Sequence, residues 1–402
     1  MAGSALLTEL FPDPFEDFFA EARREALLVE PPPPLRAPVD DVTAPAPPPP
    51  LPPPSLAAPI RPEPVFLGTE RASPRAEPLP YSWNLADSPN AFVMAIGSSG
   101  SGKTELLRVL GQELGAQGLP VVCLDFHGDL ALPGLRRLQL GPQLGINPLE
   151  IRPGAPGSAG QRAVVAQILK SVVKSLGHIQ DDLLADSLDE LLASPSAKPA
   201  TLADLRRVLQ RREEQLSKRQ AAAGLLAALR TVFDDPAFRA SRHVSTAQLL
   251  AHGASIDLCG LSADARTVAA GAVLAQVFEA LRAAGPLAVR GQLRCFVLLD
   301  EAAVMRESPF VETIAKEARK FGLGLAVATQ QATDLGESLR ANAASAAVFR
   351  AHNLKEAKHG AELFDGLAPD QLMRLSVGEC FFRDAAGLRR LRIVPTFERQ
   401  AP

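Results

Sequence analysis

The sequence has few cysteines, and none of them is spaced like a metal ligand. Its 402 residues include only Cys123, Cys259, Cys295 and Cys380, and none of these lies in a C-x-x-C or Cys/His pattern. Each one lies in or beside an apolar run that resembles a strand. We therefore expect buried thiols in a reducing compartment.

Long hydrophobic runs and a strong net charge are also missing. No apolar run approaches the roughly 20 residues that span a bilayer, and no charged-then-apolar signal peptide opens the chain. These features predict a soluble, cytoplasmic protein without membrane insertion. The net charge of −3 argues against a uniformly basic, histone-like nucleic-acid binder, but it is compatible with one local basic channel.

Proline, in contrast, is abundant near the N-terminus. Residues 31–80 contain runs such as PPPPLRAP and APAPPPPLPPP. Such a segment favours polyproline II and has few apolar groups to bury, so we expect a disordered linker that acts as a semi-rigid spacer. A ligand for a proline-recognition module is the less favoured alternative.

Residues 1–30 combine acidic and aromatic side chains. Phe11, Phe15, Phe18 and Phe19 lie among acidic residues. Such a stretch is typical of a short amphipathic helix that docks into a partner's groove. A helix without a partner, or one that packs on its own chain, explains the pattern equally well.

The most informative stretch is 91–110, AFVMAIGSSGSGKTELLRVL. The apolar run Phe92–Ile96 leads into the phosphate-binding pattern GxxxxGK[ST], and an amphipathic helix follows. Glycines let successive backbone N–H groups surround an anion, and the helix N-terminus adds partial positive charge. The stretch therefore predicts a nucleoside triphosphate site.

Within this site, Lys103 would reach the β- and γ-phosphates, and the Thr104 hydroxyl would ligate magnesium. The predicted nucleotide-binding residues are Gly97, Ser98, Ser99, Gly100, Ser101, Gly102, Lys103, Thr104 and Glu105.

Two further apolar runs end in carboxylates. One run ends at Asp125, and the other, LRCFVLLD, ends at Asp300 and is followed by Glu301. Ligands collect at the carboxyl ends of strands in open α/β sheets. We expect Asp300 to hold the magnesium hydration shell and Glu301 to orient or deprotonate the attacking water. Asp125 either supports the magnesium or caps a loop.

Three more polar residues are candidates for the reaction. Gln330 follows a predicted strand, Leu323–Ala328, where an amide can sense the γ-phosphate and position water. Arg319 lies near the end of the preceding helix, where it could act as an arginine finger on a neighbouring subunit's site. Pairing with its own helix dipole is the alternative. Arg350 is a second candidate for the finger.

Residues 161–252 are predicted to be helical, because they show no strand-like alternation. One charged helix in this region presents either a DNA-facing stripe or a solvated face that pairs with Glu213 and Glu214. Its basic residues are Arg206, Arg207, Arg211, Arg212, Lys218 and Arg219.

In this order, the segments GSSGSGKT, DFHGD, GINPLEI, LLDEA, EARKFGLGL and ATQ resemble the HerA/FtsK superfamily of DNA-pumping ATPases, and the HerA branch is the most similar. The resemblance covers about residues 83–392. It implies a RecA-like α/β P-loop domain with a mostly parallel sheet flanked by helices and an all-α insertion. It also implies a homohexameric ring that uses ATP and Mg²⁺ to translocate on double-stranded DNA.

The resemblance assigns roles to matching positions. Lys103 and Thr104 match the nucleotide- and magnesium-binding pair, and Asp300 and Glu301 match the magnesium-supporting and catalytic acids. Gln330 matches the sensor, Arg319 the trans-acting arginine, and Asp125 the acid that closes the family's second strand.

The chain departs from the HerA pattern in three places. A proline-rich segment stands where HerA proteins carry an N-terminal β-barrel. The family's Arg-Pro after the sensor glutamine is Gln331-Ala332 here, and its glycine before the finger arginine is Ala318.

These observations predict a docking segment at 1–30, a linker at 31–80, an ATPase domain at 81–160 and 253–400, and a helical insertion at 161–252. The predicted function is a HerA-like translocase or helicase in DNA repair or processing. A conjugation or type IV secretion ATPase is the alternative, and the partner would then be a secretion system rather than a nuclease. A nucleotide-switched scaffold that recruits partners through its N-terminal segment is a third interpretation.

Overall fold

The structure is a computed structural model that describes residues 56–70, 77–150, 158–173, 175–193, 199–301 and 309–399. All of them belong to one unit, Pro53–Pro402. The predicted docking segment, residues 1–30, lies outside the described residues, so it stays a prediction.

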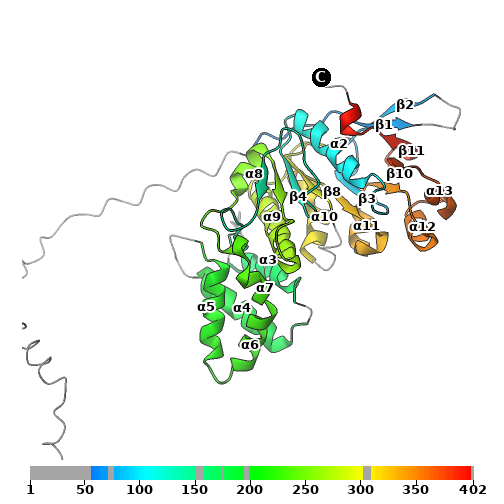
Figure 1. Cartoon of the computed structure of the whole chain (residues 1–402). Helices are drawn as coiled ribbons and strands as arrows, with labels where there is room; N and C mark the ends of the chain where they lie inside the picture. The colour runs from blue at the N-terminus through cyan, green and yellow to red at the C-terminus, as the bar shows by residue number, and fades with distance from the viewer. Residues whose placement is uncertain are drawn as a thin grey trace, which may run out of the picture. The chain divides into compact units, whose positions relative to one another are not determined.

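One sheet of 11 strands forms the centre of this unit, in the order β2-β1-β11-β10-β9-β3-β8-β7-β4-β6-β5 (Figure 1). From β9 to β5 every neighbouring pair is parallel. In sheet order these strands are β9 (Ser345–Phe349), β3 (Phe92–Ile96), β8 (Leu323–Thr329), β7 (Cys295–Leu299), β4 (Val121–Asp125), β6 (Ala254–Asp257) and β5 (Arg137–Gln139).

The parallel strands are apolar on both faces because helices cover both faces. In β3, Phe92, Met94 and Ile96 belong to one core cluster, and Val93 and Ala95 belong to the other. This explains the continuous apolar run in the sequence, which is typical of a parallel strand buried on both sides.

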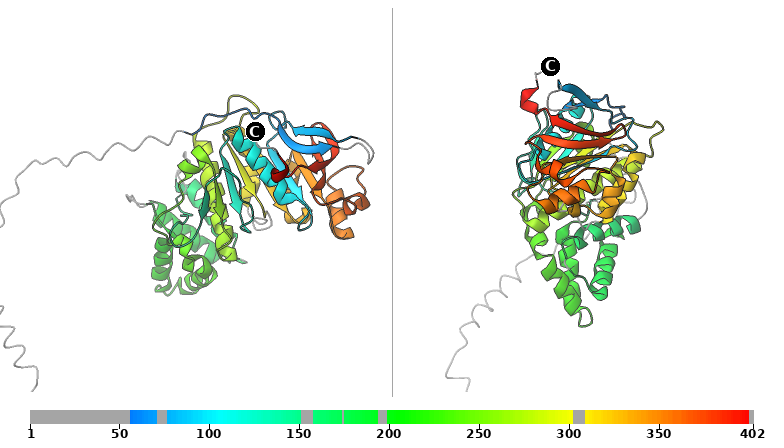
Figure 2. Two further views of the ribbon diagram at one scale, coloured as in Figure 1. Left: turned by 45° about the horizontal axis from the view of Figure 1, so that its top comes forward. Right: turned by 90° about the vertical axis from the view of Figure 1, so that its right-hand side faces the viewer.

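The helix α2 (Lys103–Ala116) packs on one face of the sheet through Leu106, Leu107 and Leu110. The other face is covered by α9 (Ala263–Ala283) and α10 (Pro309–Phe321), whose buried residues share a core cluster with the strands (Figure 2). Helices on both faces of a mostly parallel sheet are the layer arrangement that the sequence predicted.

Antiparallel strands extend the sheet beyond β9. They are β10 (Glu379–Asp384), β11 (Gly387–Ile393), β1 (Val65–Glu70) and β2 (Leu79–Trp83). The strand β1 lies inside residues 31–80, for which the sequence predicted a disordered linker, and that prediction is wrong for this stretch. Surrounding prolines masked the buried positions Val65 and Leu67, which pack beside β11 because β1 pairs with it.

Between β5 and β6 most of the described chain is helical, and Figure 1 shows α4, α5 and α6 projecting away from the sheet. The helix α5 begins at a capping box, in which the Thr201 side chain and the Asp204 side chain each bond the other's backbone N–H. The limits of the predicted insertion stay a prediction. The helices here are α3 (Ser158–Lys170), α4 (His178–Ala193), α5 (Leu202–Glu213), α6 (Arg219–Ala228), α7 (Arg230–Asp234) and α8 (Thr246–His252).

Short helices complete the C-terminal part: α11 (Glu337–Asn342), α12 (Leu354–Ala361) and α13 (Pro369–Met373). Cys123, Cys295 and Cys380 are buried in strands as expected, but Cys259 is exposed because it lies in the loop after β6. No described helix is both long enough and apolar enough to cross a membrane.

Candidate active site

The loop between β3 and α2 adopts a conformation that only glycine accommodates easily. Gly102 has φ +118°, and a Cβ atom there would lie 3.0 Å from the Gly378 Cα. Gly102 is also the N-cap of α2 and supplies no side-chain cap, so the first-turn N–H groups are available to an anion. The local sequence therefore gives this helix end the geometry that an anion site requires.

Lys103 lies folded over this loop. Its Nζ donates hydrogen bonds to the carbonyl oxygens of Gly97 at 2.7 Å and Ser98 at 3.0 Å. Burial lowers the pKa of Lys103, and the negative charges of Glu301 and Glu356 act in the opposite direction. The structure thus brings Lys103 near Glu301, from the neighbourhood of β7, as the predicted site requires.

Asp125 is fully buried at the end of β4, and its carboxylate organises the loop that follows. Oδ1 accepts hydrogen bonds from the backbone N–H groups of His127 (3.3 Å) and Gly128 (2.6 Å), and Oδ2 accepts one from Leu130 (3.2 Å). This is the loop-capping alternative that the sequence left open. A metal-supporting role for Asp125 stays a prediction.

Asp300 directly follows β7, and only one of its two carboxylate oxygens accepts a hydrogen bond from the described residues. Oδ1 accepts a hydrogen bond from Phe126 N at 3.0 Å, whereas Oδ2 is buried without a hydrogen-bond partner among the described residues. Burial raises the pKa of Asp300 to about 7, and the neighbouring Asp125 charge acts in the same direction. An unpaired buried carboxylate oxygen suits a cation or its hydration shell.

Carboxylate oxygens of Asp125, Asp129 and Asp300 all lie within 4.8 Å of one another. Oxygen donors of this kind are the ligands that Mg²⁺ prefers. The residues at this end of the sheet therefore fit the predicted magnesium, with Asp300 carrying the free oxygen.

His127 faces the predicted catalytic acid, and the sequence did not single it out. Its Nε2 lies 3.6 Å from Glu301 Oε2. The bonds from Asp125 hold the loop that carries His127. The segment DFHGD contains this histidine, but only the pairing of β4 with β7 places it beside Glu301.

Gln330 follows β8 and is exposed. It lines a small cavity together with Gly97, Ser98 and Glu356, so it lies beside the phosphate-binding loop. The strand pairing explains this position, because β8 is the direct neighbour of β3.

Glu356 on α12 is a second residue that sequence reasoning missed. Its Oε2 accepts a hydrogen bond from Ser98 Oγ at 2.9 Å, and Ser98 Oγ in turn accepts one from His352 N at 2.9 Å. Asn353 caps α12 by accepting from Glu356 N. The capping pattern Asn-x-x-Glu was the available signal for this helix.

The two candidate finger arginines lie at different ends of the parallel strands. Arg350 follows β9, and its carbonyl oxygen accepts a hydrogen bond from Ser98 N at 3.0 Å, so it lies at the carboxyl edge with the loop. Arg319 lies in the last turn of α10, directly before β8, and therefore at the amino edge. The seven residues of β8 separate these edges by about 20 Å.

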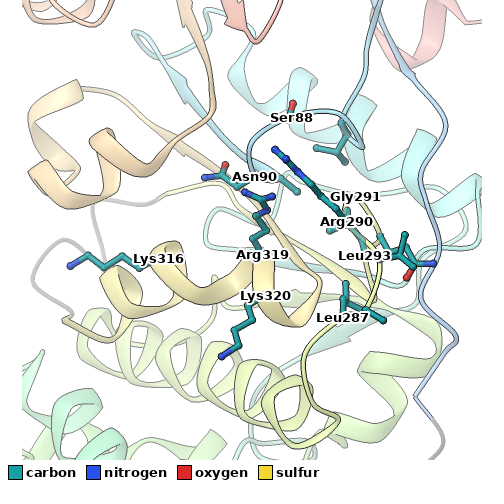
Figure 3. Close-up of a pocket in the computed structure, with 14 residues that line it drawn as sticks. Ser88, Asn90, Leu287, Arg290, Gly291, Leu293, Lys316, Arg319 and Lys320 are labelled. Carbon is teal, nitrogen blue, oxygen red and sulfur yellow. The ribbon is translucent and has the colours of Figure 1, made fainter.

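At the amino edge, Arg319 lines a cavity of about 380 Å³, which we call the amino-edge cavity (Figure 3). Ala91, before β3, and Leu293, before β7, line it as well. An arginine side chain is much shorter than the strands, so Arg319 cannot reach the phosphate loop of its own chain.

Glu105 and the basic helix have partners of their own. Glu105 accepts a hydrogen bond from Arg108 of its own helix (2.8 Å) and one from Thr396 N (2.6 Å), and the second bond ties α2 to the C-terminal segment. A contact of Glu105 with the nucleotide stays a prediction. Cations of α5 pair with acids of the helical region, which favours the solvated-face interpretation. The pairs are Arg206–Asp234, Arg207–Asp204, Arg211–Glu190 and Arg212–Glu190.

Comparison with known families identifies the central part of the chain. Residues 94–277 match the family model described as the central domain of helicase HerA. No curated protein matches the chain. These residues are therefore similar to the HerA central domain, and the resemblance predicted from the motifs is confirmed.

Solved structures agree on the fold. VirB4 of Thermoanaerobacter pseudethanolicus is 17% identical with a TM-score of 0.68, and the match covers 84% of this chain and 98% of that chain. The plasmid coupling protein TrwB in complex with ADP and Mg²⁺ is 16% identical with a TM-score of 0.58, and the match covers 80% of this chain and 88% of that chain. TrwB in complex with a non-hydrolysable ATP analogue is 17% identical with a TM-score of 0.59, and the match covers 79% of this chain and 88% of that chain. The predicted RecA-like α/β fold is confirmed.

Proposed function

We propose that this protein binds ATP with Mg²⁺ at the carboxyl edge of its parallel strands and hydrolyses it to drive movement on double-stranded DNA. The observation that carries this proposal is the position of Lys103, whose ammonium group lies in the field of the Glu301 and Glu356 carboxylates. A phosphate-loop lysine beside the acid at the end of β7 is the arrangement that phosphoryl transfer to water needs.

Each side chain has a defined task in this proposal. The N-terminus of α2 binds the phosphates, and Lys103 exchanges its bonds to the Gly97 and Ser98 carbonyls for bonds to phosphate oxygens. Glu301 accepts a proton from the attacking water, and Gln330 orients that water. Thr104 and Asp300 are the residues that would hold magnesium, which would neutralise charge on the phosphates.

We further propose that the active form is a homohexameric ring in which Arg319 completes the site of the adjacent copy. The opposite placement of Arg319 and Lys103 along β8 and β3 supports this, because a head-to-tail contact between identical copies brings opposite edges together. Arg350 lies at the carboxyl edge of its own site, so it is the weaker candidate for a trans-acting finger.

The biological setting is proposed from the comparisons. The HerA match supports a translocase or helicase that acts in the cytoplasm in DNA repair or processing. The likeness to the bacterial conjugative coupling protein TrwB, with a TM-score of 0.57, supports the alternative of conjugation or type IV secretion. A nucleotide-switched scaffold remains the candidate of another class, and it would hydrolyse ATP without a response to DNA.

The test is the ATP turnover rate with and without duplex DNA, on a sample whose mass in solution is measured in parallel. We expect a ring-sized particle whose turnover rises on addition of duplex DNA. Glu301→Gln should retain ATP binding and lose turnover about 10²- to 10⁴-fold, because it keeps the shape of the acid without its basicity. Normal turnover of Glu301→Gln would exclude this acid as the catalytic base, and a monomer indifferent to DNA would exclude the motor.

A further inference from the structure

The amino-edge cavity is strongly basic. Arg290, Lys316, Arg319 and Lys320 line it, and none of the described residues that line it is acidic. Lys316 lies 3.8 Å from Glu312, its neighbour on α10. For Arg290 and Arg319, the described part of the chain supplies no side-chain hydrogen bond and no ion pair.

The two arginines extend toward the same part of the cavity. Figure 3 shows the side chains of Arg290 and Arg319 directed into one region, whereas Lys316 and Lys320 point away from it. Two guanidinium groups without a carboxylate repel each other, and a phosphate anion would relieve that repulsion through bidentate hydrogen bonds. The chemistry of the cavity therefore matches a multiply charged phosphate.

The loop that carries Arg290 is firmly held. The Arg290 carbonyl accepts a hydrogen bond from Arg61 Nη1 at 3.3 Å, and Leu293 exchanges two backbone bonds with Ile60, at 2.8 and 2.7 Å. Gly291 has φ +82°, and a Cβ atom there would lie 2.4 Å from the Ala86 carbonyl oxygen. The backbone thus presents Arg290 at a fixed position, as a preorganised phosphate contact requires.

We propose that Arg290 acts together with Arg319 as a second trans-acting cation, and that the amino-edge cavity receives the terminal phosphates of the nucleotide held by an adjacent copy. This inference rests on the proposed function, because it needs a ring of identical copies. The cavity lies at the amino ends of the strands whose carboxyl ends carry the phosphate loop, so one head-to-tail contact would join the two. The exposed Val289 beside Arg290 suits such a contact.

The test compares Arg290→Ala, Arg290→Lys and the control Arg374→Ala in the full chain, with turnover, ADP affinity, DNA affinity and mass in solution measured for each. Arg374 is an exposed cation that follows α13 and does not line the cavity. We expect Arg290→Ala to lower turnover about 10²-fold with unchanged ADP affinity, whereas Arg374→Ala stays within about twofold of the wild type. Arg290→Lys should also lose most turnover, because lysine lacks the bidentate fork.

Arg290→Lys also protects the test against an assembly defect, since it keeps the positive charge at the contact. If Arg290→Lys assembles like the wild type and turns over within twofold of it, the inference is wrong. It is also wrong if Arg290→Ala loses DNA affinity while its DNA-free turnover is unchanged, because the cavity would then bind the DNA backbone. Absence of turnover in the wild type would instead overturn the proposed function itself.

Discussion

The two edges of the parallel sheet differ in how their charged groups are held. At the carboxyl edge, Lys103, Asp125 and Asp300 are at least partly buried, and each makes hydrogen bonds within its own chain. At the amino edge, Arg290 and Arg319 are exposed and have no such partners among the described residues. In the proposed function the first edge holds a phosphate of its own nucleotide, and the second edge contacts an anion supplied by another copy.

This difference indicates why one copy of the chain is not sufficient for the proposed reaction. About 20 Å of strand separates the two edges, so the cations of the amino edge serve a nucleotide only across a contact between copies. Variants at the two edges should therefore fail in different ways.

At the amino edge, the largest effect is expected from Arg319→Ala. It should lower ATP turnover by about 10³-fold, because it removes the charge that stabilises the transition state, while ADP affinity stays unchanged. Lys316→Ala, one turn earlier on α10, is the matched control and should retain turnover within a few-fold. Similar losses in both variants would indicate a general effect of charge instead.

At the carboxyl edge, Lys103→Ala should impair nucleotide binding itself, which Arg319→Ala leaves unchanged. Nucleotide affinity should fall about 10²-fold or more, because a charged hydrogen bond to phosphate is lost, and turnover should fall with it. Titration with a fluorescent ADP analogue measures this, with Lys320→Ala at the other edge as the control. Equal affinity in Lys103→Ala and wild type would remove the carboxyl edge as the nucleotide site.

Asp300→Asn should change the pH dependence of stability in metal-free, nucleotide-free protein. Because burial raises the pKa of Asp300 to about 7, the folded state holds a proton that the unfolded state releases near pH 4. The wild type therefore loses free energy of unfolding as the pH rises from about 4 to 7. The Asp300→Asn variant lacks this loss. Its free energy of unfolding should therefore exceed that of the wild type by about 2–4 kcal/mol at pH 8 and by less at pH 5. Unfolding curves with the same difference at both pH values would contradict this.

The smallest effect is expected from Glu356→Ala. The loss of its bond to Ser98 should loosen the phosphate loop and weaken ADP binding by about tenfold. Glu362→Ala, an exposed acid at the end of the same helix, should have no effect. An unchanged ADP affinity in Glu356→Ala would show that the loop needs no support from α12.

The sequence correctly predicted those parts of the structure that depend on residues close together along the chain. The run Phe92–Ile96 forms β3 with the predicted bounds. Asp125 is the last residue of β4, and Asp300 directly follows β7, as the sequence predicted. The spacing of residues along the chain was sufficient to predict these elements, because the glycine pattern, the apolar runs and the acids at strand ends are all visible within short stretches of sequence.

The parts that it missed depend on contacts between distant residues. Ser98 and Glu356 are 258 positions apart, and His127 meets Glu301 only because β4 pairs with β7. The strand β1 was hidden among prolines and becomes a strand by pairing with β11. Arg290 lies in a loop without a motif, so its position beside Arg319 could only come from the folded chain.

The most direct test of the two-edge account is the ATP turnover of mixed subunits. Lys103→Ala has an intact amino edge, and Arg319→Ala has an intact carboxyl edge, so each supplies what the other lacks. Mixing the two inactive proteins before assembly should restore a substantial fraction of wild-type turnover. Mixtures that stay as inactive as their components, although they form particles of the wild-type mass, would contradict the account.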